Sequence, residues 1–270
     1  MRVVAHLSDL HFGHHDDRVE EALLASLREK HPDLVVVSGD FTQRALKAEF
    51  AAARRFLDRI AQPKLVVPGN HDVPLYDLLA RLFRPLENYC RYIAPAGVPG
   101  ARLIEDEIAI LGLSTARRFT GTNGRVSHEQ MDEIRRVFRP IPQAVMKVLV
   151  THHPLGSAEG HAKVEHAFRS GEALRATAEA GVHLLLSGHH HSSASGEIDA
   201  EITFDGHILV IHAGTAISTR LRSAEGNTYN LLRIAPDRVS VSVMECSSEA
   251  GFRKTSEAVF LLARDVWRRV

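Results

Sequence analysis

Short apolar runs alternate with stretches of helical period along the first part of the chain. The apolar runs have the length and β-branched composition of buried strands, and the main ones are residues 3–7, 34–37, 65–67, 148–150 and 184–186. Residues 18–30 and 47–61 instead place apolar side chains on one face at helical spacing. Strands that alternate with helices predict a parallel sheet with helices packed against it.

The segment after the third apolar run has a different pattern. Residues 74–92 carry leucines and a phenylalanine at amphipathic helical spacing, interrupted by Pro85. We therefore expect a helical, cap-like insertion at about residues 74–99. It would lie either over a functional site or against the edge of the sheet.

The second half of the chain is richer in strand patterns. Residues 102–105 and 108–113 are typical of a hairpin, and residues 127–138 of a helix with Ser127 as its N-cap and Gln130 at the capping-box position. After Gly188 the pattern predicts strands at residues 198–204, 208–212, 229–234 and 239–244, whereas residues 258–270 fit helix and strand equally. Since no repeat or long linker divides the chain, we expect one domain of the α/β (α+β) class over residues 1–270.

The composition is that of an ordinary globular protein, with 44% hydrophobic and 24% charged residues among 270. Lys and Arg number 33, as do Asp and Glu, so no global field favours a long nucleic acid, and a small-molecule partner is expected. No apolar run approaches membrane-spanning length, and His6 and Asp9 interrupt the N-terminal run, unlike a signal peptide. The two cysteines cannot form a disulfide framework. We expect a cytoplasmic protein without integral membrane association, for which a homo-oligomer is compatible with the sequence.

Histidine is the residue type in excess, at 17, and many of these histidines lie in polar clusters directly after the five apolar runs. The clusters read Asp9-Leu10-His11, Gly39-Asp40, Gly69-Asn70-His71-Asp72, His152-His153-Pro154 and Gly188-His189-His190-His191. In an open α/β sheet, loops converge on a ligand at the carboxyl ends of the strands, so these five segments are predicted to meet. Turns require glycine, asparagine and aspartate but not repeated histidine, which favours a functional interpretation.

The residue types in these clusters point to metal chemistry. Mixed imidazole and carboxylate ligands suit Mn, Fe, Zn, Ni or Co. Two such ions about 3.5–4 Å apart can share one carboxylate, polarise a phosphoryl group and acidify a bridging water. In an extended chain, alternation would direct Asp9 and His11 to one side, and His189 and His191 likewise. Asp40, alone after its glycine, is the natural bridging ligand.

In order and wording the clusters resemble the signature of the calcineurin-like metallophosphoesterase family: D-x-H, GD, GNH with an acidic residue, H, and G-H-x-H. The match covers residues 9–191. The resemblance implies a four-layer αββα sandwich, with two mixed β-sheets flanked by helices. It also implies that one metal ion is held by Asp9, His11, Asp40 and His191, and the second by Asp40, Asn70, His152 and His189. His71 would be catalytic, as a general acid or by stabilising charge on the phosphoryl group.

Further positions are candidates for substrate contact. By resemblance to the protein phosphatases, Arg44 would grip phosphate, although a solvated helix start explains it equally well. Asn70 would stabilise charge on the substrate, His153 would orient its neighbour or touch substrate, and Arg117 lies in a turn that could border the pocket. Gln43 stands where purple acid phosphatases have a tyrosine ligand and protein phosphatases an aspartate paired with the catalytic histidine. We therefore expect no purple chromophore, and His71 must be oriented by another group.

In size and motif wording the chain is similar to bacterial class III cyclic-nucleotide and glycerophosphodiester phosphodiesterases, which begin with a comparable Ser-Asp-x-His-Phe segment. This implies hydrolysis of a small phosphodiester, of the 3′,5′-cyclic nucleotide or glycerophosphodiester type, by attack of a metal-bridging hydroxide. One alternative is a UDP-2,3-diacylglucosamine pyrophosphate hydrolase, although these enzymes typically carry arginine where His71 stands. A second alternative, of another class, is a non-catalytic protein-binding scaffold on the same fold, which predicts degraded ligands.

Overall fold

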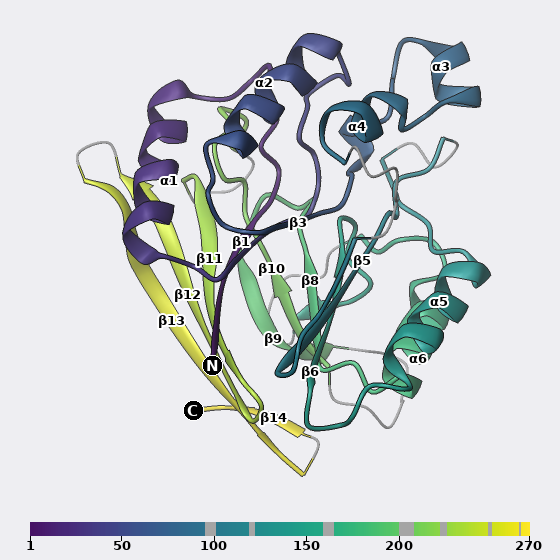
Figure 1. The fold of residues 1–270 in the computed structure, drawn as a ribbon, viewed down its shortest axis with the longest axis vertical. Helices are drawn as coiled ribbons and strands as arrows, with labels where there is room; N and C mark the ends of the chain where they lie inside the picture. The colour runs from purple at the N-terminus through teal and green to yellow at the C-terminus, as the bar shows by residue number, and fades with distance from the viewer. Residues whose placement is uncertain are drawn as a thin grey trace.

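The structure is a computed structural model. It describes residues 1–94, 101–118, 122–158, 165–199, 208–221, 226–247, 250–264 and 266–270. Within these residues the strands form two seven-stranded sheets, packed face to face with helices on both outer sides (Figure 1).

The first sheet joins strands from the two ends of the chain, in the order β14-β13-β12-β11-β1-β2-β3. Three N-terminal strands run parallel to one another: β1 (Arg2–Leu7), β2 (Leu34–Val37) and β3 (Lys64–Val66). The others pair antiparallel: β11 (Thr228–Ala235), β12 (Arg238–Ser247), β13 (Gly251–Ala263) and β14 (Val266–Arg269). Residues 258–270, ambiguous by sequence, thus belong to strands, and Trp267 is buried on the last of them.

The second sheet has the order β4-β5-β6-β8-β10-β9-β7. Its central strands are parallel: β5 (Ile108–Leu113), β6 (Met146–Thr151), β8 (Leu184–Ser187) and β10 (Leu209–His212). The edges are antiparallel: β4 (Arg102–Ile104), β9 (Ala194–Asp199) and β7 (Ser157–Ala158). The predicted hairpin of β4 and β5 is confirmed, and of the strand expected at residues 198–204, residues 200–204 lie outside the described residues.

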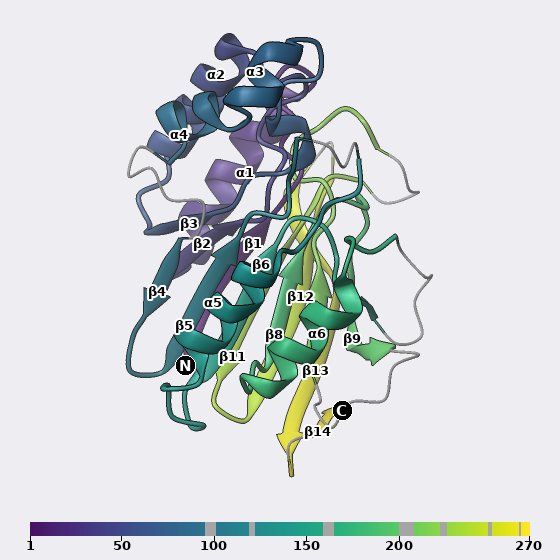
Figure 2. The ribbon, with the colours of Figure 1, turned by 90° about the vertical axis from the view of Figure 1, so that its right-hand side faces the viewer.

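Alternation of side chains along the strands builds the layers. Val4 and Val36 point into the core between the two sheets, whereas their neighbours Ala5, Val35 and Val37 point to the helical side. Helices α1 (Asp17–Lys30) and α2 (Lys47–Asp58) cover the first sheet. Helices α5 (His128–Phe138) and α6 (Ser170–Glu179) cover the second (Figure 2). The predicted four-layer αββα sandwich is therefore confirmed.

Two helix features bear on the sequence-based expectations. Ser127 caps α5 and Gln130 completes the capping box, as predicted. Helix α6 was not predicted, because its buried face consists largely of alanines, which give a weak amphipathic signal.

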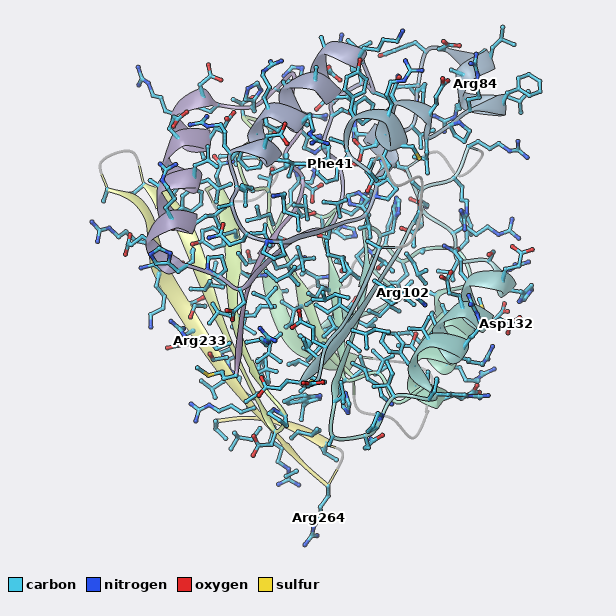
Figure 3. The ribbon with its side chains drawn as sticks, viewed as in Figure 1. Phe41, Arg84, Arg102, Asp132, Arg233 and Arg264 are labelled. Atoms are coloured by element: carbon cyan, nitrogen blue, oxygen red, sulfur yellow. The ribbon has the colours of Figure 1, made fainter. Side chains whose placement is uncertain are left out.

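The insertion after β3 forms a turn of 3-10 helix, η1 (Asn70–Asp72), and two short helices, α3 (Leu78–Phe83) and α4 (Glu87–Tyr92). Pro85 separates the two helices, as the sequence indicated. Helix α4 buries Tyr89 against the core beneath α2, whereas α3 buries no residue. Figure 3 places Arg84, just after α3, at the periphery of the molecule and Phe41 in its interior. Residues 95–99 of the expected insertion lie outside the described residues.

Candidate metal centre

The loops at the carboxyl ends of β1, β2, β3, β6 and β8 meet at one place. Backbone hydrogen bonds join them: Asp9 N–H donates to Gly39 O (3.0 Å), His11 N–H to Asp40 O (2.9 Å) and Gly188 N–H to His152 O (3.0 Å). Nitrogen and oxygen atoms of metal-binding type lie within 4.8 Å of one another in overlapping groups. These groups comprise Asp9–His11–His191, Asp9–Asp40–His152, His11–Asp40–His71 and His152–His153–His189.

Asp40 lies between the two halves of this centre. Its Oδ2 is 3.3 Å from His152 Nε2 and 3.8 Å from His11 Nε2. On the side of His11, Asp9 Oδ1 lies 3.6 Å from His11 Nε2 and 3.4 Å from His191 Nε2. One carboxylate facing imidazoles from both sides is the arrangement that a bridging ligand requires.

The other half gathers around His152. Asn70 Oδ1 is 3.2 Å from His152 Nε2, and the ring of His189 is centred 5.1 Å from that of His152. The Nδ1 of His152 donates to the carbonyl oxygen of Ser38 at 2.7 Å, so Nε2 is the ring nitrogen that faces the centre. The side chain of His190 points elsewhere, as expected, with its Nε2 3.1 Å from Glu165 O.

The local backbone differs from the one expected. Positive φ angles occur at five of the seven predicted ligands: Asp9 (52°), His11 (49°), Asp40 (53°), His189 (75°) and His191 (59°). The expectation that D-x-H and H-x-H work through the alternation of an extended chain is therefore wrong. Residues other than glycine rarely adopt this conformation, and it costs on the order of 1–3 kcal/mol each. Such strain, repeated in one centre, is typical of a functional site.

The donor set fits transition-metal ions. Asp9, His11, Asp40 and His152 are each at most 1% exposed. Among the described residues, Asp9 Oδ1 and both ring nitrogens of His11 are buried without a hydrogen-bond partner. Buried polar atoms without partners are costly, and coordination of a cation would satisfy them.

Electrostatics within the cluster favour a cation as well. Burial opposes ionisation of Asp40, yet the neighbouring His152 and His71 rings hold the pKa of its carboxyl well below its usual range. Burial would favour a neutral His152, but the Asp40 carboxylate raises its pKa to about 9. Burial, helped by the charge of His152, lowers the pKa of His189 to about 3. The Asp40 carboxylate thus remains negative and available to metal ions.

His71 lies beside the centre and is half-buried. Its backbone N–H donates to Asp40 Oδ1 at 2.8 Å, and its ring meets that of His11 edge-on at a centroid distance of 4.8 Å. The ring Nδ1 is 2.8 Å from the backbone carbonyl oxygen of Gln43, to which it donates. The main chain of Gln43 therefore orients His71, where sequence reasoning had left the orienting group unknown.

Asp72 is a site residue whose role sequence reasoning missed. Its carboxylate accepts hydrogen bonds from the backbone N–H groups of Phe41 (3.2 Å), Thr42 (3.0 Å) and Gly69 (2.9 Å), and from Thr42 Oγ1 (3.0 Å). It thereby ties the loop of Asp40 to the turn of Asn70 and His71. Its position directly after the histidine of the GNH cluster was the signal available in the sequence.

The remaining candidates for substrate contact lie in different environments. Arg44 is exposed at the start of the α2 region. Arg117 is partly buried, and its guanidinium donates to Gln130 Oε1 at the start of α5. His153 is 1% exposed, with Nδ1 2.7 Å from Thr115 Oγ1 and Nε2 2.8 Å from Thr122 O. Both of its ring nitrogens are thus engaged by the protein, which favours its predicted role of orienting a neighbour over substrate contact.

Comparison with known proteins agrees with this geometry. The family model for calcineurin-like phosphoesterases matches residues 2–193, more than half of the chain. The chain therefore belongs to the calcineurin-like phosphoesterase family, which supports a hydrolase that acts on phosphoesters.

Curated relatives match over shorter stretches. Over 82 residues the chain is 35% identical to glycerophosphodiester phosphodiesterase GpdQ from Enterobacter lignolyticus, covering 26% of this chain and 29% of that protein. Over 53 residues it is 30% identical to a probable cyclic nucleotide phosphodiesterase from Synechococcus sp., covering 20% and 21%. Each alignment thus spans less than a third of the relative's length.

Solved structures show the same fold at low sequence identity. PhoD is 12% identical with a TM-score of 0.73, and the match covers 100% of this chain and 71% of PhoD. A dimetal phosphatase from Danio rerio is also 12% identical, with a TM-score of 0.64 and coverage of 97% and 99%.

Across the described residues, we find no helix whose length and hydropathy would allow it to cross a membrane.

Proposed function

We propose that this protein hydrolyses a small phosphodiester, of the 3′,5′-cyclic nucleotide or glycerophosphodiester type. The observation that carries the proposal is the convergence of His152 and His11 on the carboxylate of Asp40, with His71 at the rim of the site. The two curated relatives, both phosphodiesterases by name, favour a diester over a monoester.

In this proposal seven side chains hold two metal ions. Asp9, His11, Asp40 and His191 hold one ion, and Asp40, Asn70, His152 and His189 hold the other. When bound, two ions supply Lewis acidity and an activated water for attack on phosphorus. The protein preorganises the site for two cations. It does so through the buried carboxylates of Asp9 and Asp40 and through the ring of His152, which a hydrogen bond to Ser38 O holds in place.

The partly exposed residues next to the centre act on the substrate. His71 donates Nδ1–H to Gln43 O, so its Nε2 is the atom that can hold a proton for the leaving alkoxide. Asn70 is also partly exposed and can stabilise the added charge through its amide. Arg44 is exposed and remains our candidate for a phosphate contact. Residues 74–92 are proposed to border the substrate entrance.

A non-catalytic scaffold on this fold would not require a complete set of metal ligands. Here all seven predicted ligands are present and converge, and five adopt strained φ angles. Strain of this kind persists where function maintains it, which favours an enzyme.

The test compares bis-p-nitrophenyl phosphate with p-nitrophenyl phosphate after reconstitution with Mn²⁺ or Zn²⁺. We expect the diester to be hydrolysed with the larger kcat/KM. Preference for the monoester would replace the diester proposal with a phosphatase, and cleavage of neither ester would refute an enzyme of this kind. A subsequent screen of cyclic AMP, cyclic GMP, glycerophosphodiesters and UDP-2,3-diacylglucosamine distinguishes the substrate classes.

Two variants separate the proposed roles. His71→Ala should retain two metal ions and lose turnover by about 10²–10⁴-fold, the contribution of a general acid. Asp40→Ala should lose metal, because it removes the shared ligand. Equal loss of metal in both variants would contradict the assigned roles.

A further inference from the structure

Helix α3 presents its apolar face to solvent. Leu78, Leu79 and Phe83 are 71–72% exposed and Leu82 is 36% exposed. At about 100° per residue these four side chains occupy a single arc of roughly 140°. The preceding loop adds two more exposed apolar residues. We call this set, Leu75, Tyr76, Leu78, Leu79, Leu82 and Phe83, the α3 patch.

The polar side of α3 fixes this orientation. Arg81 Nε donates to the carbonyl oxygen of Arg118 at 2.7 Å, and its Nη1 donates to that of Pro74 at 3.1 Å. In return, Arg118 Nη1 donates to Leu82 O at 2.8 Å. The helix is therefore attached to the protein through its arginine, and the apolar face is turned outward by these bonds.

The patch is large for the surface of a monomer. Six aromatic and aliphatic side chains at these exposures present roughly 600 Å² of apolar surface, at the upper end of the range of about 300–600 Å² for the largest patch on a monomer. Surfaces of this size mark sites that contact a partner or a membrane.

Basic side chains border the patch. Arg84 and Arg118 are exposed at the end of α3, and Arg84 forms a solvent-exposed pair with Glu87 at 3.3 Å. With Arg81 these arginines outnumber the nearby acids Asp77 and Glu87, so the local charge is slightly positive in a chain with equal numbers of acidic and basic residues. Figures 1 and 2 place α3 at the end of the molecule away from the C-terminus, and Figure 3 shows Arg84 at its outer edge.

We propose that the α3 patch docks the protein on the surface of an anionic phospholipid bilayer. A projecting apolar helix face with a tyrosine at one end and arginines at the other has the features of an interfacial helix. Self-association through the same patch is the alternative that the experiment below distinguishes from binding to a bilayer. The proposal concerns binding alone and is independent of the diester specificity proposed above.

Co-sedimentation of the full chain with vesicles tests the proposal. The vesicles are phosphatidylcholine alone, or phosphatidylcholine with about one quarter phosphatidylglycerol. We expect binding to the anionic vesicles, weakened at least about tenfold by the triple substitution Leu78→Ser, Leu79→Ser and Phe83→Ser. Arg84→Glu should weaken it at least about fivefold and should act on the anionic vesicles specifically.

The matched control replaces exposed apolar residues elsewhere, Ile104→Ser with Leu261→Ser, and should leave vesicle binding unchanged. Far-UV circular dichroism and metal content establish that each variant is folded. Failure of the wild-type chain to bind anionic vesicles would overturn the proposal, as would unchanged binding by the folded triple variant. A dimer in light scattering that the triple variant abolishes, without vesicle binding, would assign the patch to a second copy instead.

Discussion

Asp72 is the side chain on which two loops of the metal centre depend. Its Oδ1 accepts from Thr42 N–H and Thr42 Oγ1, and its Oδ2 accepts from Phe41 N–H and Gly69 N–H. The carboxylate is 1% exposed. Asp72→Ala would leave three buried backbone N–H groups without their acceptor, whereas Thr42 Oγ1 keeps the carbonyl oxygen of His71 at 3.0 Å.

The magnitude follows from the number of donors. Each buried donor that loses its partner costs about 1–3 kcal/mol, and partial rehydration of the cavity offsets some of this. We therefore expect Asp72→Ala to lower the free energy of unfolding by about 4 kcal/mol. Asp72→Asn keeps one accepting oxygen but turns an N–H₂ group toward two donors, so the loss should be about 2–3 kcal/mol.

Urea unfolding of the metal-free protein in EDTA, followed by far-UV circular dichroism, measures these differences. Burial and the charge of Asp40 raise the pKa of Asp72 to about 7 although its backbone donors lower it, so pH 8 keeps the carboxyl ionised. The control is Asp132→Ala on the outer face of α5 (Figure 3), expected to change stability by at most about 0.5 kcal/mol. A loss of less than about 1 kcal/mol for Asp72→Ala would refute the reasoning.

Three further predictions address the backbone, the pH dependence and the metals. Gly39 has φ +106°, and a Cβ there would lie 2.5 Å from His152 Nδ1, so Gly39→Ala should weaken metal binding at least about tenfold in isothermal calorimetry. Burial lowers the pKa of His6 to about 3, although the charge of Asp9 raises it. The unfolded chain therefore binds a proton at His6 more readily than the folded protein, and the free energy of unfolding decreases as the pH falls from 6.5 toward 3. Between pH 7.5 and 5 the metal-free wild type should lose about 2 kcal/mol more than His6→Phe in urea unfolding, and equal losses would contradict this. Removal of metal with EDTA should lower the urea midpoint and abolish turnover, and both should return with Mn²⁺ or Zn²⁺, whereas turnover that persists without metal would exclude the proposed chemistry.

Much of the fold was predictable because its signals are local. The apolar runs at β1, β2 and β8 mark buried strands directly, and the capping box of Ser127 marks the start of α5. Helix α6 was not predictable from its alanine-rich face, and residues 258–270 became strands because pairing with β12 is a long-range choice. Tertiary context decides such segments.

The chemistry of the site was predictable for a different reason. Parallel strands end at one edge of their sheet, so the order of the clusters predicts that those after β1, β2 and β3 meet, and that those after β6 and β8 meet. That His152 also reaches Asp40, which faces His11, depends on the packing of the two sheets against each other.

How those residues converge was decided by the tertiary structure alone. The left-handed backbone at Asp9 and His191, the hydrogen bond from His71 to Gln43 O and the four bonds to Asp72 arise only where distant loops constrain one another. The outward apolar face of α3 is likewise set by the bonds of Arg81 to segments on either side of it. Periodicity records which face of a helix is apolar, but the direction of that face depends on contacts between residues far apart in the chain.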